Sequence, residues 1–227
     1  MVLKAIVKTV MLDESHPFRL LTGSGVSGRQ WQAFLHRSAY GELVLELDSQ
    51  QQSGVDVSDL KQEPLVRIDT LELQACLNRG IQSMASSASI GMLSDAVVKN
   101  FREITGYDRV MVYKFDPDGH GKIIAEARNP RLESLLGNHY PATDIPQSGQ
   151  PLDMSLCQLR SMSPLHLQYL KNMGVTTTVV ASLVREGRLW GLVAAHHYSP
   201  RNLDFPIRIA CDLLSEVIST RIAAIEN

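Results

Sequence analysis

The most constraining feature of this sequence is a pair of β-branched, apolar segments joined by a short turn. Residues 176–184 are rich in threonine and valine, residues 185–187 contain a glycine, and residues 188–197 return with a second apolar run. Alternating β-branched segments are typical of strands, and a short glycine-containing turn joins antiparallel neighbours. We predict two long neighbouring strands that form the centre of a sheet.

A second antiparallel pair is predicted upstream. Residues 108–115 and 122–127 have the composition of strands, and residues 116–119 between them carry aspartate, proline and glycine. These are the residue types that turns prefer. The two pairs together predict an antiparallel sheet.

Helices are predicted before and after this sheet. The pattern turns helical from Thr70, and a helix that ends at Gly106 would carry five apolar residues on one face: Ile90, Leu93, Val97, Phe101 and Ile104. A left-handed glycine commonly ends a helix in this way. Residues 207–225 predict a last helix. Helices on one side of an antiparallel sheet make an α+β fold, whose other face can hold a ligand under the irregular segment 128–173.

The N-terminal part predicts a smaller sheet. Residues 5–12, 31–36 and 42–47 read as short strands, with Gly23, Gly25 and Gly28 breaking the stretch between the first two. Residues 48–63 are polar and resemble a linker. We therefore divide the chain into residues 1–63 and residues 64–227.

Composition narrows the class of protein. With 44% hydrophobic residues, 20% charged residues and a net charge of -2, the chain can bury a core and lacks the basic surface of a nucleic-acid or anionic-lipid binder. There is no apolar span of membrane length, so we expect a cytoplasmic protein. The odd number of cysteines, Cys76, Cys157 and Cys211, suggests neither a disulfide framework nor a zinc site.

Eight short segments of the chain carry a recognisable pattern. Six lie in the second part, 107–113 (YDRVMVY), 126–128 (EAR), 140–146 (YPATDIP), 159–161 (LRS), 163–174 (SPLHLQYLKNMG) and 189–197 (LWGLVAAHH), and two lie upstream, 34–38 (FLHRS) and 43–47 (LVLEL). The six segments, in this order, resemble the GAF domain of phytochromes, and the two upstream segments resemble the final strands of the PAS domain that precedes it. The resemblance implies a GAF domain that binds a linear tetrapyrrole (bilin), biliverdin or phycocyanobilin, and senses red and far-red light.

The resemblance also implies roles for individual residues. The Asp144 carbonyl would contact the pyrrole nitrogens, His166 would lie beside them through water, and His196 near the carbonyl of an end ring, with His197 on the opposite strand face. An ordinary histidine pKa of about 6.5 would make pigment absorption sensitive to pH near neutrality. The remaining expected contacts are Tyr113, Tyr140 and Tyr169 as walls, Arg160 at a propionate, and Ile145, Pro146, Ser163 and Thr178.

Two departures from the family pattern bear on how the pigment would be held, and the first predicts non-covalent binding. Leu165 stands where plant-like and cyanobacterial members carry the attaching cysteine, and the region ahead of the PAS domain, which carries it in bacterial members, has no counterpart here. The segment after Pro146 is short and lacks a propionate-holding arginine and tyrosine. Such a lost charge-assisted contact would weaken pigment binding by roughly 1.5 to 3 kcal/mol.

A second interpretation is a pigment-free GAF module for dimerisation or signal relay. Leu213, Leu214, Val217 and Ile218 on the last helix would then pack on a partner. A homodimer through the GAF helices, and an output domain such as a histidine kinase in the parent protein, would fit both interpretations. We find no catalytic constellation that favours an enzyme, and a cyclic-nucleotide sensor rests on fold analogy alone.

Overall fold

The computed structural model describes residues 18–24, 30–37, 43–50, 69–140, 157 and 164–227. The chain divides into two compact units. The first comprises Met1–Leu60 and Gln147–Met162, and the second comprises Lys61–Pro146 and Ser163–Asn227. The expected boundary between residues 63 and 64 lies outside the described residues.

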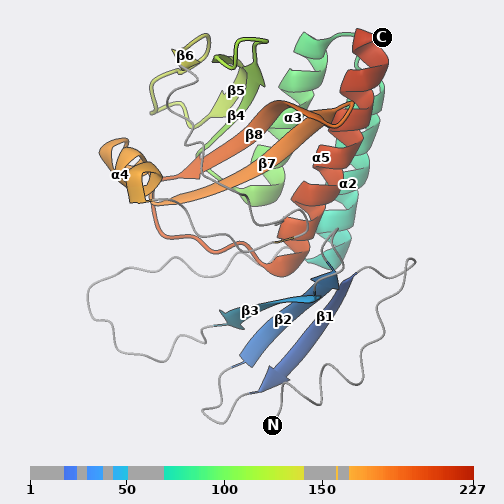
Figure 1. The fold of residues 1–227 in the computed structure, drawn as a ribbon, viewed down its shortest axis with the longest axis vertical. Helices are drawn as coiled ribbons and strands as arrows, with labels where there is room; N and C mark the ends of the chain where they lie inside the picture. Colours follow the sequence, from blue (N-terminus) through green and yellow to red (C-terminus); the bar gives the residue numbers. More distant parts are fainter. Residues whose placement is uncertain (1–17, 25–29, 38–42, 51–68, 141–156, 158–163) are drawn as a thin grey trace. The chain divides into compact units, whose positions relative to one another are not determined.

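The described strands of the first unit form a three-stranded antiparallel sheet in the order β1-β2-β3 (Figure 1). Its strands are β1 (Phe18–Ser24), β2 (Gln30–Arg37) and β3 (Leu43–Gln50). The second and third were expected from sequence, but β1 was not. Gly23 had been interpreted as a break, yet it pairs with Trp31 inside the strand, because a neighbouring strand supplies the ladder hydrogen bonds that local propensity does not measure. The strand expected over 5–12 lies outside the described residues.

The second unit holds the remaining elements. These are α2 (Thr70–Ala85), α3 (Ile90–Thr105), β4 (Arg109–Phe115), β5 (Gly121–Arg128), β6 (His139–Tyr140), α4 (Pro164–Asn172), β7 (Thr177–Arg185), β8 (Arg188–His197) and α5 (Phe205–Glu226). Both predicted strand pairs and the predicted helices are present. The α+β fold with an antiparallel sheet is therefore confirmed.

The order of the five strands is β6-β5-β4-β8-β7, and every neighbouring pair is antiparallel. Strand β4 occupies the centre, between β5 and β8. The expectation that β7 and β8 form the centre was wrong for β7, which lies at the edge. Hairpin signals predict which strands pair in sequence, but the pairing of β4 with β8 joins segments about 80 residues apart and has no local signal.

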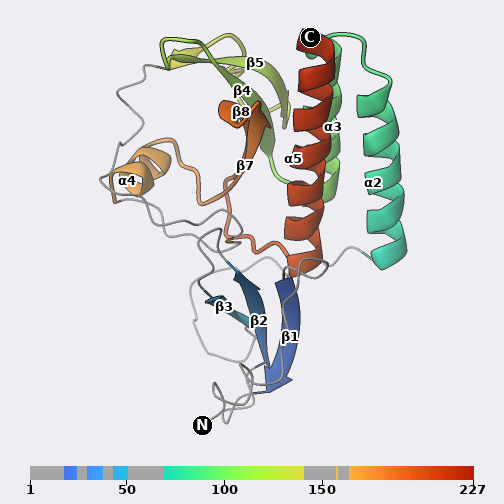
Figure 2. The ribbon, with the colours of Figure 1, turned by 45° about the vertical axis from the view of Figure 1, so that its right-hand side comes forward.

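One face of the sheet is covered by helices. Figure 2 shows α2, α3 and α5 on one side of the strands and α4 on the other. The side chains between the strands and the three helices form the main core, which includes Leu93, Val97, Phe101, Leu214 and Ile218. Helix α3 ends as predicted, because Gly106 adopts a left-handed conformation with φ of 63°.

Helix α4 lies within the segment that was expected to be irregular. Pro164 stands at its first position, where a missing N–H costs nothing. It ends at Asn172, Gly174 follows with a φ of 70°, and the Val175 N–H donates to the Leu170 carbonyl at 2.9 Å. Its apolar periodicity is weak, so the helix was not recognised from the sequence.

Helix α5 packs on the sheet with the stripe that had been considered for a partner. Leu214 and Ile218 are fully buried in the core, whereas Leu213 is 45% exposed. The expectation that all four residues of this stripe were available to another molecule was wrong for these two buried residues. Among the described helices, none is both long and apolar enough to cross a membrane.

Candidate ligand-binding site

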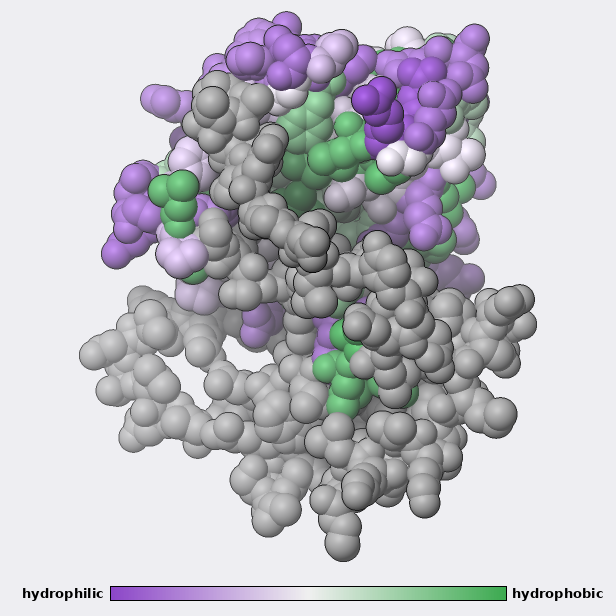
Figure 3. All heavy atoms as spheres, viewed as in Figure 1, coloured by the Kyte–Doolittle hydropathy of each residue, from purple (hydrophilic) through white to green (hydrophobic). Residues whose placement is uncertain are grey.

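The sheet face opposite α2, α3 and α5 holds a cavity of about 410 Å³. Its walls include residues of β4, β5, β6, β7 and β8 and of α4, all within the second unit. Figure 3 shows hydrophobic residues gathered in this part of the molecule, with hydrophilic residues around them. The volume falls in the range of small-molecule and cofactor sites, and the lining is mostly apolar, as such sites are.

Strand alternation decides which side chains reach the cavity. Met111, Tyr113 and Phe115 from β4 line it, whereas Val110 and Val112 point into the helix-covered core. The same alternation on β8 brings Leu192, Ala194 and His196 to the cavity and Val193 and Ala195 to the core. Successive side chains of a strand face opposite sides.

Aromatic rings form much of the wall. The Tyr113 ring lies 5.7 Å from the Tyr140 ring and 5.2 Å from the Phe115 ring. On α4, the His166 and Tyr169 rings are 5.9 Å apart. These spacings are typical of tilted and edge-to-face aromatic pairs, so the wall combines flat apolar faces with hydroxyl and imidazole edges.

The adjacent histidines at the end of β8 have different surroundings. His196 lines the cavity. His197 lies on the other face, where its Nδ1 is 2.7 Å from Asp108 Oδ2 and its ring stacks on Tyr107 at 5.4 Å. As expected, the two histidines point to opposite faces of the sheet. His196 is therefore the β8 histidine that can contact a ligand in the cavity.

The His196 side chain is electrically neutral at neutral pH. Burial, followed by the electrostatic interactions with Arg109 and with His166, lowers its pKa from 6.5 to about 4. Arg109 contributes because it lies opposite His196 in the β4–β8 register. The expectation that a histidine of this site titrates near neutrality was therefore wrong for His196, because the sequence does not reveal burial or a cation on the next strand.

Thr178 contributes an unsatisfied polar atom. Its residue lines the cavity, and its buried Oγ1 has no hydrogen-bond partner within the described part of the chain. Because buried polar groups are normally paired, this atom favours a cavity that receives a polar group of a ligand.

Six of the expected site residues are brought together around this cavity: Tyr113, Tyr140, His166, Tyr169, Thr178 and His196. The other five, Asp144, Ile145, Pro146, Arg160 and Ser163, lie outside the described residues. Several lining residues were missed, among them Met111, Phe115, Val180, Leu192 and Met173. Strand alternation would have found Met111, Phe115, Val180 and Leu192. Each lies an even number of residues along the strand from Tyr113, Thr178 or His196 and therefore shares its sheet face.

The described cysteines are distributed away from the cavity lining. Cys76 and Cys211 belong to the helix-covered core and are at most 4% exposed. Burial raises the pKa of Cys211 to about 12, which keeps it a thiol. Leu165, at the position of an attaching cysteine in plant-like and cyanobacterial phytochromes, lines the cavity and is 73% exposed.

Residues 89–225 match the family model of the GAF domain, which is more than half of the chain. The chain belongs to the GAF domain family. This GAF portion contains α3, the five-stranded sheet and nearly all of α5, so the family match covers the elements that build the cavity.

Curated relatives of this GAF protein include phytochromes. A bacteriophytochrome of Xanthomonas campestris pv. campestris is 40% identical over 177 residues, covering 64% of this chain and 28% of the relative. Cyanobacterial phytochrome B of Nostoc sp. (strain PCC 7120) is 34% identical over 243 residues, covering 93% of this chain and 31% of the relative. The chain thus spans about a third of the length of these relatives.

Solved structures extend the likeness over both units. The chromophore-binding domain of Stigmatella aurantiaca phytochrome, in a point-mutant form in the Pr state, is 31% identical with a TM-score of 0.76, covering 98% of this chain and 79% of that one. The chromophore-binding domain of a bacteriophytochrome from R. palustris is 28% identical with a TM-score of 0.75, covering 94% of this chain and 76% of that one. The predicted resemblance to a phytochrome photosensory module is confirmed.

Proposed function

We propose that this protein is a light-sensing domain that binds a bilin in the cavity of its GAF unit and responds to red and far-red light. The observation that carries the proposal is the cavity of about 410 Å³ on the sheet face opposite α2, α3 and α5, lined by His196 and by Thr178, whose Oγ1 has no partner among the described residues. The solved neighbours described as chromophore-binding domains support the same assignment.

The chemistry of the lining suits a conjugated tetrapyrrole. Its flat pyrrole rings gain by burial against Tyr113, Phe115 and the apolar sheet residues. A neutral His196 can accept or donate a hydrogen bond without introducing a second buried charge beside a protonated pigment. Thr178 can pair with a ring carbonyl, which would satisfy its Oγ1.

The residues outside the described ranges complete the proposal. Asp144, with Ile145 and Pro146, would direct a carbonyl to the pyrrole nitrogens, and Arg160 would pair with a propionate. Ser163 directly precedes α4 in sequence, at the end that carries Leu165 and His166.

We propose that the pigment is held without a covalent bond. Leu165 lacks the thiol that would add to a bilin vinyl group, and Cys76 and Cys211 are buried in the core opposite the cavity. Biliverdin and phycocyanobilin both fit this mode of binding, because neither needs a thiol for insertion.

The test is to purify the chain, add biliverdin or phycocyanobilin, and record spectra before and after red and far-red light. We expect a red-shifted band that changes reversibly with illumination. Denaturation should release the pigment, leaving no zinc-induced fluorescence on the polypeptide. A featureless visible spectrum with both bilins would refute the photoreceptor assignment, and fluorescence retained on the chain would refute non-covalent binding.

A matched pair of variants locates the pigment. Thr178→Val keeps the shape of the side chain, removes Oγ1 from the cavity, and should shift the absorption band or weaken binding. The control is Thr177→Val, at the residue of β7 that precedes Thr178. The Thr177 hydroxyl donates to the Ser199 carbonyl at 3.2 Å, and Thr177 is absent from the cavity lining. Equal spectra for Thr178→Val and the unmodified protein would remove this contact from the proposal.

A pigment-free relay or dimerisation module is the second candidate. Leu213 on α5 is 45% exposed and Leu71 on α2 is 73% exposed, so the helical layer retains apolar side chains for a second copy. Light scattering on the pigment-free protein and on Leu213→Glu tests this. A stable dimer that the substitution dissociates, with no spectral response to bilins, would favour the relay module.

The full-length context belongs to the same proposal. Because the chain spans about a third of its curated relatives, we propose that the parent protein carries an output domain such as a histidine kinase and dimerises through the GAF helices. Light would then act through α5 on that domain, from a cytoplasmic location, while the present chain supplies no catalytic step of its own.

A further inference from the structure

The first unit contains a cluster of three potential ligands that plays no part in the bilin site. His36, Glu46 and Cys157 each contribute one donor atom, and these atoms all lie within 4.8 Å of one another. His36 is 1% exposed, Glu46 is 9% exposed, and Cys157 is half-buried. We propose that this cluster is a binding site for a zinc-like divalent transition-metal ion.

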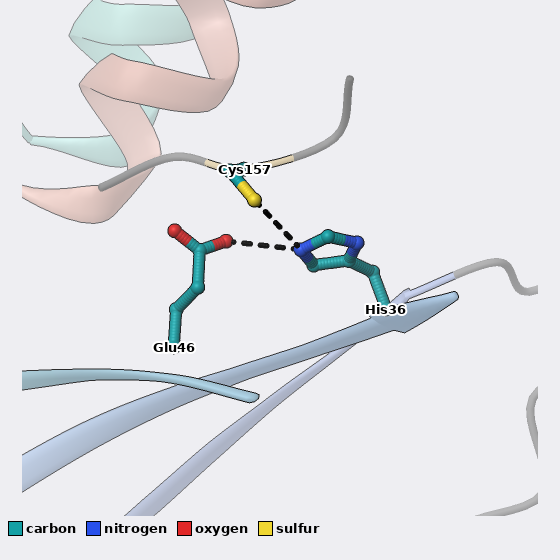
Figure 4. Close-up of side chains that lie close together, drawn as sticks. All are labelled: His36, Glu46 and Cys157. Carbon is teal, nitrogen blue, oxygen red and sulfur yellow. Dashed lines mark hydrogen bonds and ion pairs between the residues drawn. The ribbon is translucent and has the colours of Figure 1, made fainter. Parts of the chain in front are cut away.

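Strand pairing brings two of the three ligands together. His36 lies on β2 and Glu46 on β3, and the register pairs Glu46 with Phe34. His36 is two residues beyond Phe34, so it shares the sheet face of Glu46 as a diagonal neighbour. Cys157 approaches from a segment 121 residues away in sequence (Figure 4).

Among the described residues, the polar contacts of the imidazole gather on one nitrogen. His36 Nε2 lies 3.2 Å from Glu46 Oε1 and 3.7 Å from Cys157 Sγ, and Figure 4 shows both contacts meeting at this nitrogen. Nδ1 is buried without a hydrogen-bond partner among the residues that the structure describes. In a cysteine–histidine–acid nucleophile the thiol and the carboxylate contact different ring nitrogens, so the cluster is not arranged for nucleophilic catalysis.

Three donor atoms that all lie within 4.8 Å of one another can instead surround a metal ion. Bonds of about 2.0 to 2.2 Å to nitrogen and oxygen and about 2.3 Å to sulfur, at tetrahedral angles, place nitrogen about 3.4 Å from oxygen and about 3.6 Å from sulfur. The observed nitrogen–oxygen separation of 3.2 Å and nitrogen–sulfur separation of 3.7 Å are close to these two values. The sulfur and the carboxylate oxygen lie at most 4.8 Å apart. A shift of about 1 Å by the carboxylate or the thiol brings them to the separation that a shared tetrahedral ion requires.

Charge and ligand type select the ion. A thiolate and a carboxylate carry two negative charges, which a divalent cation neutralises in this buried position, whereas an unpaired buried charge is costly. Thiolate sulfur disfavours Mg²⁺ and Ca²⁺, which prefer oxygen ligands, and the combination of sulfur, imidazole and carboxylate suits Zn²⁺. Phe34, whose ring lies 5.6 Å from the His36 ring, adds an apolar wall. Binding releases the thiol proton, and a fourth position stays open for water.

The test uses the pigment-free chain, so that its outcome does not depend on the photoreceptor proposal. After treatment with a chelator, the chain is titrated with Zn²⁺ in competition with a chromogenic chelator. We expect one ion per chain, and at least a tenfold loss of affinity in Cys157→Ala. His120→Gln is the matched control, because His120 pairs with Asp118 at 3.1 Å in an exposed position without a thiol.

Cobalt identifies the sulfur ligand. Co²⁺ should give a thiolate-to-metal charge-transfer band in the unmodified protein that is absent from Cys157→Ala, although Cys76 and Cys211 remain. His36→Gln and Glu46→Gln should each weaken binding at least tenfold while circular dichroism stays unchanged. If either buried variant fails to fold, the half-buried Cys157 still decides the question. Substoichiometric zinc binding, or a cobalt band that persists in Cys157→Ala, would overturn the proposal.

Discussion

Arg109 and Glu126 form a buried ion pair across the centre of the GAF sheet, with Nη1 and Oε1 2.6 Å apart and both side chains at most 4% exposed. Glu126 also accepts a hydrogen bond from Ser134 Oγ at 2.6 Å, and Arg109 Nη2 donates to the Glu133 carbonyl at 2.7 Å. The ion pair therefore holds the segment after β5 against the sheet. Arg109 also lies opposite His196 in the β4–β8 register.

Glu126→Gln should destabilise the protein by about 3 to 5 kcal/mol, because it leaves the Arg109 charge buried without its partner. Chemical unfolding followed by circular dichroism measures this. The matched control is Glu103→Gln, which breaks an exposed pair with Arg79 at 2.6 Å and should cost no more than about 1 kcal/mol. Similar losses in both variants would show that burial does not strengthen the Arg109–Glu126 pair.

Stability should fall in acid because His196 is buried in its neutral form. Its pKa is about 4 in the folded chain and about 6.5 when unfolded, so between these values the unfolded state binds more protons. The contribution, about 3 kcal/mol, is fully present above pH 6.5 and lost as pH falls towards 4.

His196→Gln should remove this part of the acid sensitivity. The free energy of unfolding of the variant, measured at pH 7 and pH 4.5, should change less than that of the unmodified protein. His120→Gln, at a histidine whose side chain is 51% exposed, should leave the difference unchanged. A His196 signal that titrates near pH 6.5 in nuclear magnetic resonance would contradict the explanation.

Two glycines beside Tyr113 should respond differently to alanine. A Cβ at Gly191 would clash with the Tyr113 carbonyl oxygen, whereas at Gly121 it would meet the Tyr113 ring. Gly191→Ala must push β4 and β8 apart and should destabilise by at least about 1 to 3 kcal/mol.

Gly121→Ala should instead be tolerated by rotation of the Tyr113 side chain into the cavity. Its effect would be seen as weaker binding of added bilin, with a smaller loss of stability than in Gly191→Ala. Crystal structures of both variants locate the displaced atoms. A Tyr113 ring that keeps its position in Gly121→Ala would disprove the predicted coupling between this glycine and the cavity.

The end of α5 should loosen when Glu226 is replaced. Glu226 accepts hydrogen bonds from Lys114 Nζ at 2.9 Å, Arg185 Nη1 at 2.8 Å and Trp190 Nε1 at 3.0 Å. Burial raises the pKa of Glu226, but the bonds from Lys114 and Trp190, with the nearby charges, outweigh burial and lower it.

Glu226→Ala should therefore increase amide hydrogen exchange in the last turn of α5 and change Trp190 fluorescence. The control is Glu216→Ala on the exposed face of the same helix. In the unmodified protein the contacts should weaken as pH falls below the ordinary glutamate pKa of about 4.3. Equal exchange in both variants would mean that Glu226 does not anchor the helix.

The cavity residues differ in how far they could be predicted. Tyr113, Thr178 and His196 follow from motif resemblance, and strand alternation extends the set to Phe115 and Val180 without a structure. Met173 and Leu170 come from α4 and its end, and they could not be inferred because the weak periodicity of residues 164–172 gave no helical signal.

The amino-acid sequence by itself determined the strand hairpins, the helix from Ile90 to Gly106 and the membership of the family. The hairpins and the helix depend on local alternation, helical spacing or turn chemistry, which neighbouring residues carry, and the family membership depends on the matched sequence segments. Only the tertiary structure placed β4 at the centre of the sheet, buried His196 beside Arg109, and brought Cys157 to His36 and Glu46. These relationships join residues on different elements, and their energies come from burial and long-range contacts that local patterns do not encode.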